Sequence, residues 1–166
     1  MYKILIIEDE KPAAEWLRQL ILKFDSQISV LAVIDSVSSA TEWVQQNQAP
    51  DLVFMDIQLA DGLSFEIFER VKVPCPVIFT TAYEEYAVKA FKVNSIDYLL
   101  KPIAYNELEA AFRKFGDQIK KVEEVQPVTI ELLHKVKEML RKQYKTRFVI
   151  KVGEHLKSIP VEEILF

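Results

Sequence analysis

Cysteine and histidine are scarce in this 166-residue sequence, which contains one cysteine, Cys75, and two histidines, His134 and His155. A single thiol excludes an intramolecular disulfide and a cluster of thiolate metal ligands. The two isolated histidines support neither a metal site nor a phosphohistidine relay. No apolar stretch is long enough to span a membrane, and the amino terminus has no signal-peptide pattern. We therefore expect a soluble cytoplasmic protein that does not associate with a membrane.

The charge is small overall but unevenly distributed. The chain has a formal net charge of −4 at pH 7, yet residues 141–166 contain six lysines and arginines against three glutamates. Mild acidity over most of the chain argues against extensive coating of nucleic acid. The basic excess shows that the end of the chain differs in kind from its start, and we interpret it as a solvated face and linker.

Short continuous apolar runs recur along the first hundred residues, each bounded by polar residues. They predict strands near residues 3–7, 29–34, 52–55, 76–80 and 96–99. Such runs are typical of strands that are buried on both faces of a parallel sheet. Helical patterns alternate with them, so the sequence predicts an α/β fold: a doubly wound five-stranded parallel sheet with right-handed crossovers and helices on both faces.

The helical stretches carry local signals for their ends. Ser39 and Glu42 have the spacing of a capping box, so the second helix is expected to begin around residue 38 or 39. A third helix is expected from about Ser64, and a fourth over roughly 84–93. Asn106 is the expected N-cap of the fifth helix. The positions that this helix is expected to bury are Leu108, Ala111, Phe112, Phe115 and Ile119.

The pattern changes in the last quarter of the chain. A charged stretch at 120–124 and Pro127 interrupt the preceding helix, and the apolar spacing over 130–140 predicts one more amphipathic helix. The period then falls to two, which predicts strands near 148–152 and 156–159. The sequence stops before a new domain could bury these strands. We therefore expect a fragment of a longer protein.

Polar residues suited to phosphate chemistry follow four of the predicted strands. They are Glu8 and Asp9, then Asp56, then Thr80 or Thr81, and finally Lys101. Because ligands bind outside the carboxyl ends of the strands in an open α/β sheet, we expect these side chains to meet at one edge. Asp61 and Gly62 would let the loop after the third strand turn sharply and place the backbone carbonyl of Gln58 on a bound metal.

These residue types predict a phosphoryl-accepting site. The three carboxylates of Glu8, Asp9 and Asp56 repel one another unless a cation lies among them. Hard oxygen ligands suit Mg²⁺, which takes one or two carboxylates and keeps several waters. One carboxylate can then act as a nucleophile and form an acyl phosphate. Lys101 would neutralise one phosphoryl oxygen, and the Thr81 hydroxyl would donate to another.

The sequence resembles the receiver domain of two-component response regulators over residues 1 to about 119. In this resemblance Glu8 and Asp9 match the acidic pair, Asp56 the phosphoacceptor, Thr81 and Ala82 the hydroxyl-plus-small-residue step, Lys101 and Pro102 the lysine–proline pair, and Tyr98 the aromatic switch position. Glu8 stands where aspartate is commoner. The resemblance implies a flavodoxin/CheY-like sheet of order 2-1-3-4-5, a cis Lys101–Pro102 bond, bound Mg²⁺, and phosphorylation of Asp56 by a sensor histidine kinase.

A shorter resemblance concerns the output of such a regulator. Residues 81–91 and 95–102 look like those of regulators that carry a LytTR DNA-binding domain. Residues 147–166 are similar to the opening strands of that domain. The implied organisation is a receiver domain at residues 1–119, a helical linker at 120–145, and the beginning of the DNA-binding domain at 146–166.

The two resemblances together imply a switch. Thr81 shifts toward the phosphoryl group, and Tyr98 turns inward into the space that this shift opens. The surface made of the fourth helix, the fifth strand and the fifth helix then favours a homodimer, which brings DNA-binding domains onto paired half-sites and regulates transcription. We expect DNA binding from the full-length protein rather than from this stretch of it.

Two other classes of function remain open from the sequence. One is a receiver that acts through protein–protein interaction alone, without DNA. The other is a phosphatase or phosphotransferase with an aspartate nucleophile, which would also use Mg²⁺ and a lysine. Such enzymes place an acid–base aspartate two residues after the nucleophile, where this chain has Gln58. We therefore predict a protein that is not a turnover enzyme.

Overall fold

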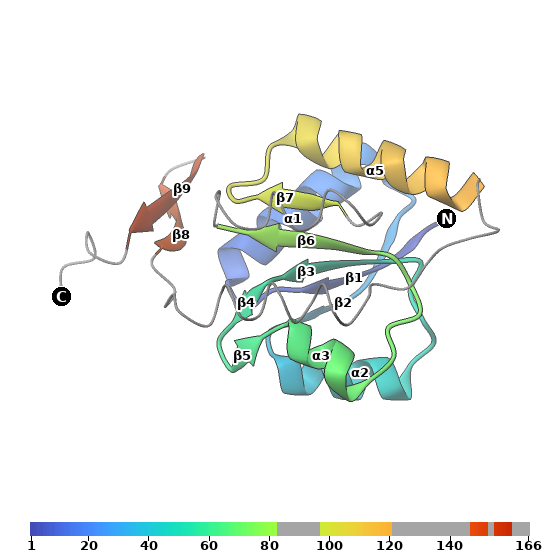
Figure 1. The fold of residues 1–166 in the computed structure, drawn as a ribbon. Helices are drawn as coiled ribbons and strands as arrows, with labels where there is room; N and C mark the ends of the chain where they lie inside the picture. Colours follow the sequence, from blue (N-terminus) through green and yellow to red (C-terminus); the bar gives the residue numbers. More distant parts are fainter. Residues whose placement is uncertain (83–96, 121–146, 153–154, 161–166) are drawn as a thin grey trace.

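The computed structural model describes residues 1–82, 97–120, 147–152 and 155–160, and the side chains of residues 1–82 and 97–119. Its centre is a five-stranded parallel sheet in the order β2-β1-β3-β6-β7 (Figure 1). These strands are β1 (Lys3–Ile7), β2 (Ser29–Ile34), β3 (Leu52–Asp56), β6 (Val77–Thr81) and β7 (Tyr98–Leu100). Numbered among the five strands alone, this is the order 2-1-3-4-5, so the predicted fold class is confirmed.

The middle of the sheet is apolar because helices cover both of its faces. All residues of β3 and β6 are buried, as is every residue of β1 after Lys3. Two apolar cores therefore form, one on each side of the sheet. The predicted strands agree with the structure to within one or two residues at each end, although β6 extends to Thr81 and thus includes the residue needed at the sheet edge.

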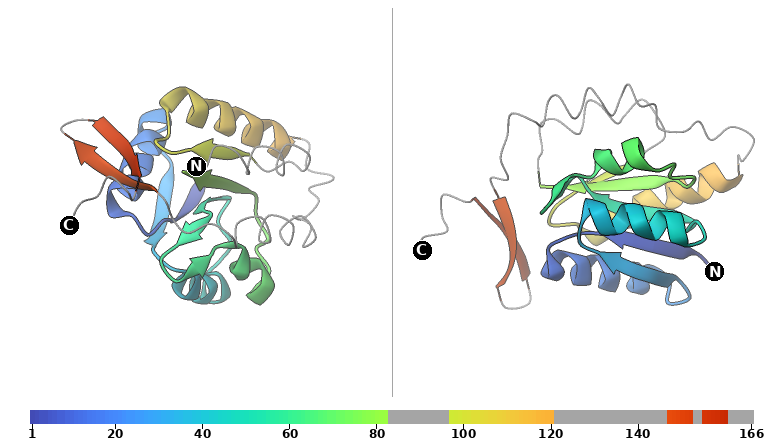
Figure 2. Two further views of the ribbon diagram at one scale, coloured as in Figure 1. Left: turned by 60° about the vertical axis from the view of Figure 1, so that its left-hand side comes forward. Right: turned by 90° about the horizontal axis from the view of Figure 1, so that it is seen from below.

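The four helices within the described residues divide between the two faces, and Figures 1 and 2 show the same layering from three directions. α1 (Lys11–Phe24) and α5 (Tyr105–Lys120) pack on one face, where Leu17 and Phe112 lie in the same buried core. α2 (Val37–Gln46) and α3 (Phe65–Arg70) pack on the other, where Val37 and Phe65 share a second core. Stacked rings of Phe24 and Phe112, with centroids 4.5 Å apart, join α1 to α5.

Three local expectations about the helices were wrong. α2 begins at Val37 rather than at residue 38 or 39, because the Ser36 hydroxyl accepts a hydrogen bond from the Ser39 backbone N–H and acts as the N-cap. α5 begins at Tyr105, so Asn106 lies inside the helix and is not its cap. Ile119 is 39% exposed, because it lies in the last turn, beyond the end of the core.

The end of the chain contains the predicted hairpin. β8 (Arg147–Val152) and β9 (His155–Pro160) pair antiparallel in a separate two-stranded sheet. The helices expected over 84–93 and 130–140 lie outside the described residues. Among the residues that the structure does describe, no helix is long and apolar enough to cross a membrane.

A short hairpin follows β3. β4 (Gln58–Leu59) pairs antiparallel with β5 (Gly62–Leu63). Gly62 has a φ of +152°, a conformation that favours glycine, so the predicted sharp turn is confirmed. The hairpin places Asp61 beside the start of α2, where its carboxylate accepts hydrogen bonds from the backbone N–H groups of Val37 (2.7 Å) and Ser38 (3.1 Å). These two bonds and the chain turn tie the loop after β3 to α2.

Candidate functional site

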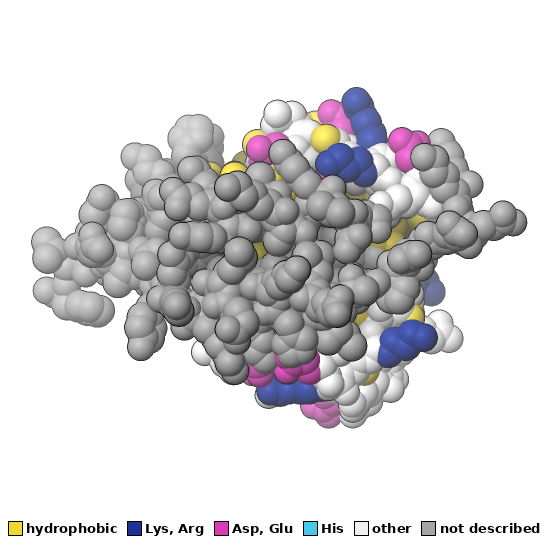
Figure 3. All heavy atoms as spheres, in the orientation of Figure 1, with side chains coloured by type: hydrophobic (Ala, Val, Ile, Leu, Met, Phe, Trp, Pro, Cys, Tyr) yellow, Lys and Arg dark blue, Asp and Glu magenta, His cyan; other side chains and the backbone are white. Residues whose placement is uncertain are grey.

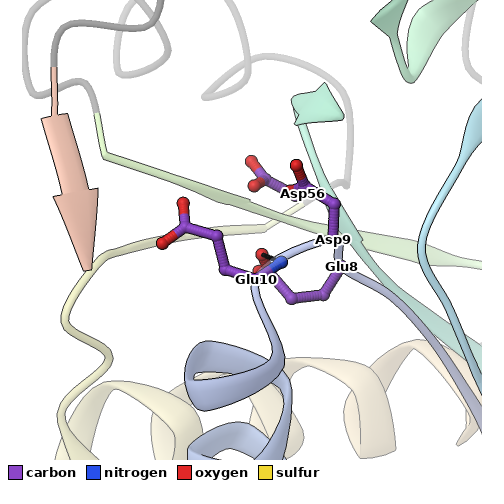
Figure 4. Close-up of side chains that lie close together, drawn as sticks. All are labelled: Glu8, Asp9, Glu10 and Asp56. Atoms are coloured by element: carbon purple, nitrogen blue, oxygen red, sulfur yellow. Dashed lines mark hydrogen bonds between the residues drawn. The ribbon is translucent and has the colours of Figure 1, made fainter. Parts of the chain in front are cut away.

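The predicted site residues do gather at the carboxyl edge of the sheet. Glu8 and Asp9 follow β1 directly, Asp56 ends β3, Thr81 ends β6, and Lys101 follows β7. In Figure 4 the side chains of Glu8, Asp9 and Glu10 follow β1, just before α1 begins, and that of Asp56 projects from the end of β3. The parallel arrangement brings together residues that are up to 93 positions apart in the chain, because all of the strands end at the same edge.

A buried lysine lies between two buried carboxylates. The Lys101 ammonium is 2.6 Å from Glu8 Oε2 and 2.7 Å from Asp56 Oδ2, and the side chains of all three are at most 5% exposed. The second oxygen of each carboxylate accepts a backbone N–H: Gln58 donates to Asp56 Oδ1 over 3.1 Å, and Glu10 donates to Glu8 Oε1 over 3.1 Å. Buried charges are tolerated where they form short ion pairs and where the remaining carboxylate oxygens accept hydrogen bonds, as here.

The charges of Glu8, Asp56 and Lys101 do not cancel. Burial raises the pKa of Glu8 to about 7; the Lys101 charge opposes the rise, and the nearby Asp56 charge adds to it. Burial by itself would lower the pKa of Lys101, but the charges and hydrogen bonds of Asp56 and Glu8 raise it above its ordinary value. Lys101 is therefore a permanent cation, and it offsets only part of the negative charge around it.

The acidic group is larger than the sequence predicted. Carboxylate oxygens of Glu8, Asp9, Glu10 and Asp56 all lie within 4.8 Å of one another. Glu10 was not among the site residues predicted from the sequence. Its position two residues beyond Glu8 in an unbroken acidic triplet was the available signal. An all-oxygen set of three or four carboxylates in this space fits a hard divalent cation such as Mg²⁺.

Thr81 and Lys101 are linked through the backbone. The Lys101 N–H donates to the Thr81 carbonyl over 2.7 Å, and the Lys101–Pro102 peptide bond is cis, as the resemblance implied. Thr80 pairs with Asp56 in the sheet register, and both threonines are buried. This hydrogen bond therefore joins the end of β6 to the first residue of the lysine loop.

Tyr98 and Gln58 lie in different elements, one on an edge strand and one shortly after Asp56. Tyr98 is half-buried on the edge strand β7, opposite Phe79, and packs against the core on the α2–α3 side. Gln58 is buried immediately beyond Asp56, and its side-chain oxygen has no hydrogen-bond partner among the described atoms.

Comparison with known proteins yields a consistent set of matches. The family described as response regulator receiver domain matches residues 4–113. The chain is similar to the sensory transduction protein LytT of Bacillus cereus, with 31% identity over 169 residues that cover all of this chain and 65% of that protein. It is also similar to LytT of Enterococcus faecalis, with 38% identity over 120 residues, covering 70% of this chain and 48% of that one.

A solved structure shares the fold of the matched region. The response regulatory domain of protein mrkE from Klebsiella pneumoniae aligns with a TM-score of 0.59 and 28% identity, and the match covers 72% of this chain and 98% of that one. The chain spans between about half and two thirds of the length of the curated relatives named above.

Proposed function

Because the chain belongs to the response regulator receiver domain family, we propose that Asp56 accepts a phosphoryl group from a sensor histidine kinase and that the resulting acyl phosphate switches the protein. The observation that carries this proposal is the buried Lys101 ammonium, 2.7 Å from Asp56 Oδ2 at the carboxyl edge of the sheet. A lysine held there can neutralise a phosphoryl oxygen on Asp56, since it is already the closest cation to that carboxylate among the described residues.

The transfer uses Asp56 as the nucleophile. One carboxylate oxygen attacks phosphorus, the bond from phosphorus to the donor's imidazole nitrogen breaks, and the imidazole leaves with its electron pair and takes up a proton from solvent. The Gln58 N–H, which donates to Asp56 Oδ1, holds the carboxylate in one orientation. Lys101 must exchange its direct contact with Asp56 for a contact with the incoming phosphoryl oxygen.

The acidic group is the proposed Mg²⁺ site. Glu8, Asp9 and Asp56 would hold the ion together with the Gln58 backbone carbonyl, and Glu10 lies close enough to act through a water. A bound Mg²⁺ would supply positive charge that reduces the repulsion between these carboxylates and an incoming phosphoryl group. Glu8 takes part in this only when it has lost its proton, because a protonated carboxyl is a poor ligand.

Turnover as a phosphatase is a weaker alternative. The position two residues beyond Asp56 is Gln58, whose amide cannot take up or release a proton at neutral pH. The curated relatives are sensory transduction proteins. We therefore assign the site to signalling, with the phosphorylated state as the signal.

The proposed switch runs through the edge of the sheet. Thr81 would move its hydroxyl toward the phosphoryl group, and Tyr98 would turn further inward from its half-buried position. The hydrogen bond from the Lys101 N–H to the Thr81 carbonyl supports this coupling, because it joins the end of β6 to the residue that follows β7, the strand that carries Tyr98. The surface affected includes β7 and α5, and we propose that two phosphorylated copies dimerise through it.

DNA binding and control of transcription are proposed for the full-length protein. The β8–β9 hairpin is compatible with a β-rich domain that starts near residue 146, after a receiver at 1–119 and a linker at 120–145. On the described part of the face in Figure 3, Lys and Arg side chains lie near Asp and Glu side chains. On α5, the Arg113 guanidinium pairs with the Glu109 carboxylate. This mixed surface supports placing the DNA contacts in the output domain.

Intact mass spectrometry tests the proposed phosphorylation. The protein is incubated with acetyl phosphate and Mg²⁺, and we expect a single phosphoryl adduct that disappears in Asp56→Asn and in EDTA. Asp51→Asn is the matched control, because Asp51 lies just before the opposite end of the same strand and should leave the adduct unchanged. Equal adduct formation in wild type and Asp56→Asn would refute the assignment.

Sedimentation and DNA binding test the output. With the full-length protein, we expect acetyl phosphate to shift the monomer–dimer equilibrium toward dimer and to tighten binding to its DNA site. A dimer that forms without any change in DNA affinity would favour the receiver that acts through protein–protein interaction alone.

A further inference from the structure

The loop between β7 and α5 carries Lys101 into the site, and it is short. It consists of residues 101–104, and its first backbone N–H is held by the Thr81 carbonyl. That single bond fixes one end of the loop, where β7 ends. The same residue, Lys101, places its ammonium between Glu8 and Asp56, so the loop begins at the site.

Trp16 on α1 holds the far side of this loop. Its indole Nε1–H donates to the Ile103 carbonyl over 2.9 Å, although the two residues are 87 positions apart in the sequence. The bond is partly buried, and the Trp16 ring packs against the core between α1 and α5. A partly buried carbonyl that lost this donor would lose its hydrogen bond in a place where water replaces it poorly.

Two further contacts attach the same loop to the same helix. The Ile103 side chain is buried in the core with Leu17 and Ile21 of α1. The Lys23 ammonium lies 4.7 Å from the centre of the Tyr105 ring, which is the first residue of α5. Both contacts hold the loop against α1, and the contact from Trp16 differs from them in being a directional hydrogen bond.

α1 also begins at Lys11, immediately after the acidic residues. The helix is 14 residues long, and its first turn continues directly from the Glu8–Glu10 segment. α1 therefore begins next to the carboxylates and, through Trp16, also contacts the loop at residues 101–104 that contains Lys101. Side-chain placement to within a fraction of an ångström matters for transfer reactions, because misplacement by about 1 Å can reduce a rate on the order of a hundredfold.

We propose that Trp16 is a positioning residue for phosphoryl transfer: its indole N–H holds the Ile103 carbonyl and thereby keeps the Lys101 ammonium between Glu8 and Asp56. The inference rests on the proposed function of Asp56 and adds to it a residue that touches neither the phosphoryl donor nor the carboxylates. Trp16 acts only through the lysine loop.

Trp16→Phe tests the proposal, with Trp43→Phe as the matched control. Phenylalanine keeps an aromatic ring in the core but removes the N–H donor, and Trp43, the second of the two tryptophans, packs on the opposite face of the sheet. At saturating Mg²⁺ and fixed acetyl phosphate, we expect Trp16→Phe to lower the rate constant for Asp56 phosphorylation about tenfold. The apparent Mg²⁺ dissociation constant should stay within about twofold of wild type, because carboxylates rather than Lys101 bind the ion.

A lower phosphorylation rate constant at an unchanged Mg²⁺ dissociation constant distinguishes a positioning role of Trp16 from general damage to the fold. A loosened core would weaken Mg²⁺ binding and phosphorylation together, and that joint loss would overturn the proposal, as would an unchanged rate. Replacement of Trp16 with benzothienylalanine provides a second variant, since sulfur takes the place of the N–H at nearly the same volume. It should reproduce the rate loss of Trp16→Phe, and a wild-type rate in this protein would also overturn the proposal.

A measurement that does not depend on phosphorylation distinguishes failure of the proposed phosphorylation of Asp56 from failure of the positioning role of Trp16. The ammonium resonance of Lys101 in ¹⁵N-labelled protein, assigned by its loss in Lys101→Arg, should move in Trp16→Phe and stay unchanged in Trp43→Phe. If wild type forms no adduct but this resonance moves, the proposed function is wrong, whereas the proposal that the Trp16–Ile103 hydrogen bond positions Lys101 is supported. If wild type forms the adduct and the resonance does not move, the proposed function is supported and the positioning role of Trp16 is wrong.

Discussion

Removal of the buried lysine is the most direct test of how the site is held together. Lys101→Met keeps much of the side-chain volume but leaves Glu8 and Asp56, both 3% exposed, without their shared cation. Deleting one partner of a buried ion pair typically costs about 3–5 kcal/mol, mostly because the remaining charge is unpaired. We expect a loss in this range for the free energy of unfolding at pH 8.5 in EDTA.

The loss should depend on pH, with a sign set by Glu8. Its pKa is already raised to about 7 by burial, and Lys101 is one of the groups that hold it down. Without Lys101 the pKa rises further, so the folded state binds a proton that the unfolded state releases, and stability falls as pH rises through this window. The limiting slope is about 1.4 kcal/mol per pH unit. Wild type levels off above pH 7, whereas Lys101→Met continues to lose stability.

Urea unfolding at pH 6.5 and pH 8.5 measures both effects. The difference between wild type and Lys101→Met should grow between the two pH values by on the order of 1–2 kcal/mol. Lys114→Met is the control, because this lysine also pairs with an aspartate, Asp97 at 2.9 Å, but its side chain is 66% exposed. Such a surface pair contributes about 1 kcal/mol or less. If Lys101→Met is as stable as Lys114→Met at pH 8.5, the ion pairs of Lys101 with Glu8 and Asp56 do not contribute the expected free energy of unfolding.

Other predictions follow from single contacts. Mg²⁺ measured by isothermal titration should bind about tenfold more weakly at pH 6 than at pH 8, because Glu8 must release a proton to bind the ion, and a pH-independent affinity would contradict its role as a ligand. Asp61→Ala should lower the unfolding free energy by about 1 kcal/mol, because it removes the acceptor for the Val37 N–H at the start of α2. Burial raises the pKa of Asp61, but its hydrogen bonds to the backbone N–H groups at the start of α2 together outweigh burial and lower it, so this difference is present above the ordinary value of 3.8 and should shrink at more acidic pH. Phe54→Ala should cost about 3–5 kcal/mol in urea unfolding, since Phe54 is fully buried in the central strand, and a cost under about 1 kcal/mol would mean that the core refills the cavity.

The sequence alone determined the sheet and the types of residue at its edge. Continuous apolar runs such as β3 have few alternatives to burial on both faces, and a polar residue directly after such a run must lie at the strand end. Asp56 and Lys101 could therefore be identified from their places in the amino-acid sequence. Helix ends were harder to predict, because Ser36 and Ser39, three residues apart, are both of a residue type that favours the N-cap position.

The tertiary structure decided which charges meet. Sequence spacing could not reveal that Glu8, one methylene longer than the commoner aspartate, reaches the Lys101 ammonium, or that Asp61 caps a helix 23 positions earlier in the chain. Nor could it indicate that Trp16 bonds to the carbonyl of Ile103. Such contacts depend on how far a helix rotates and how a loop folds back over the sheet, and these are set by packing of the whole core, whereas local sequence signals extend over only a few residues.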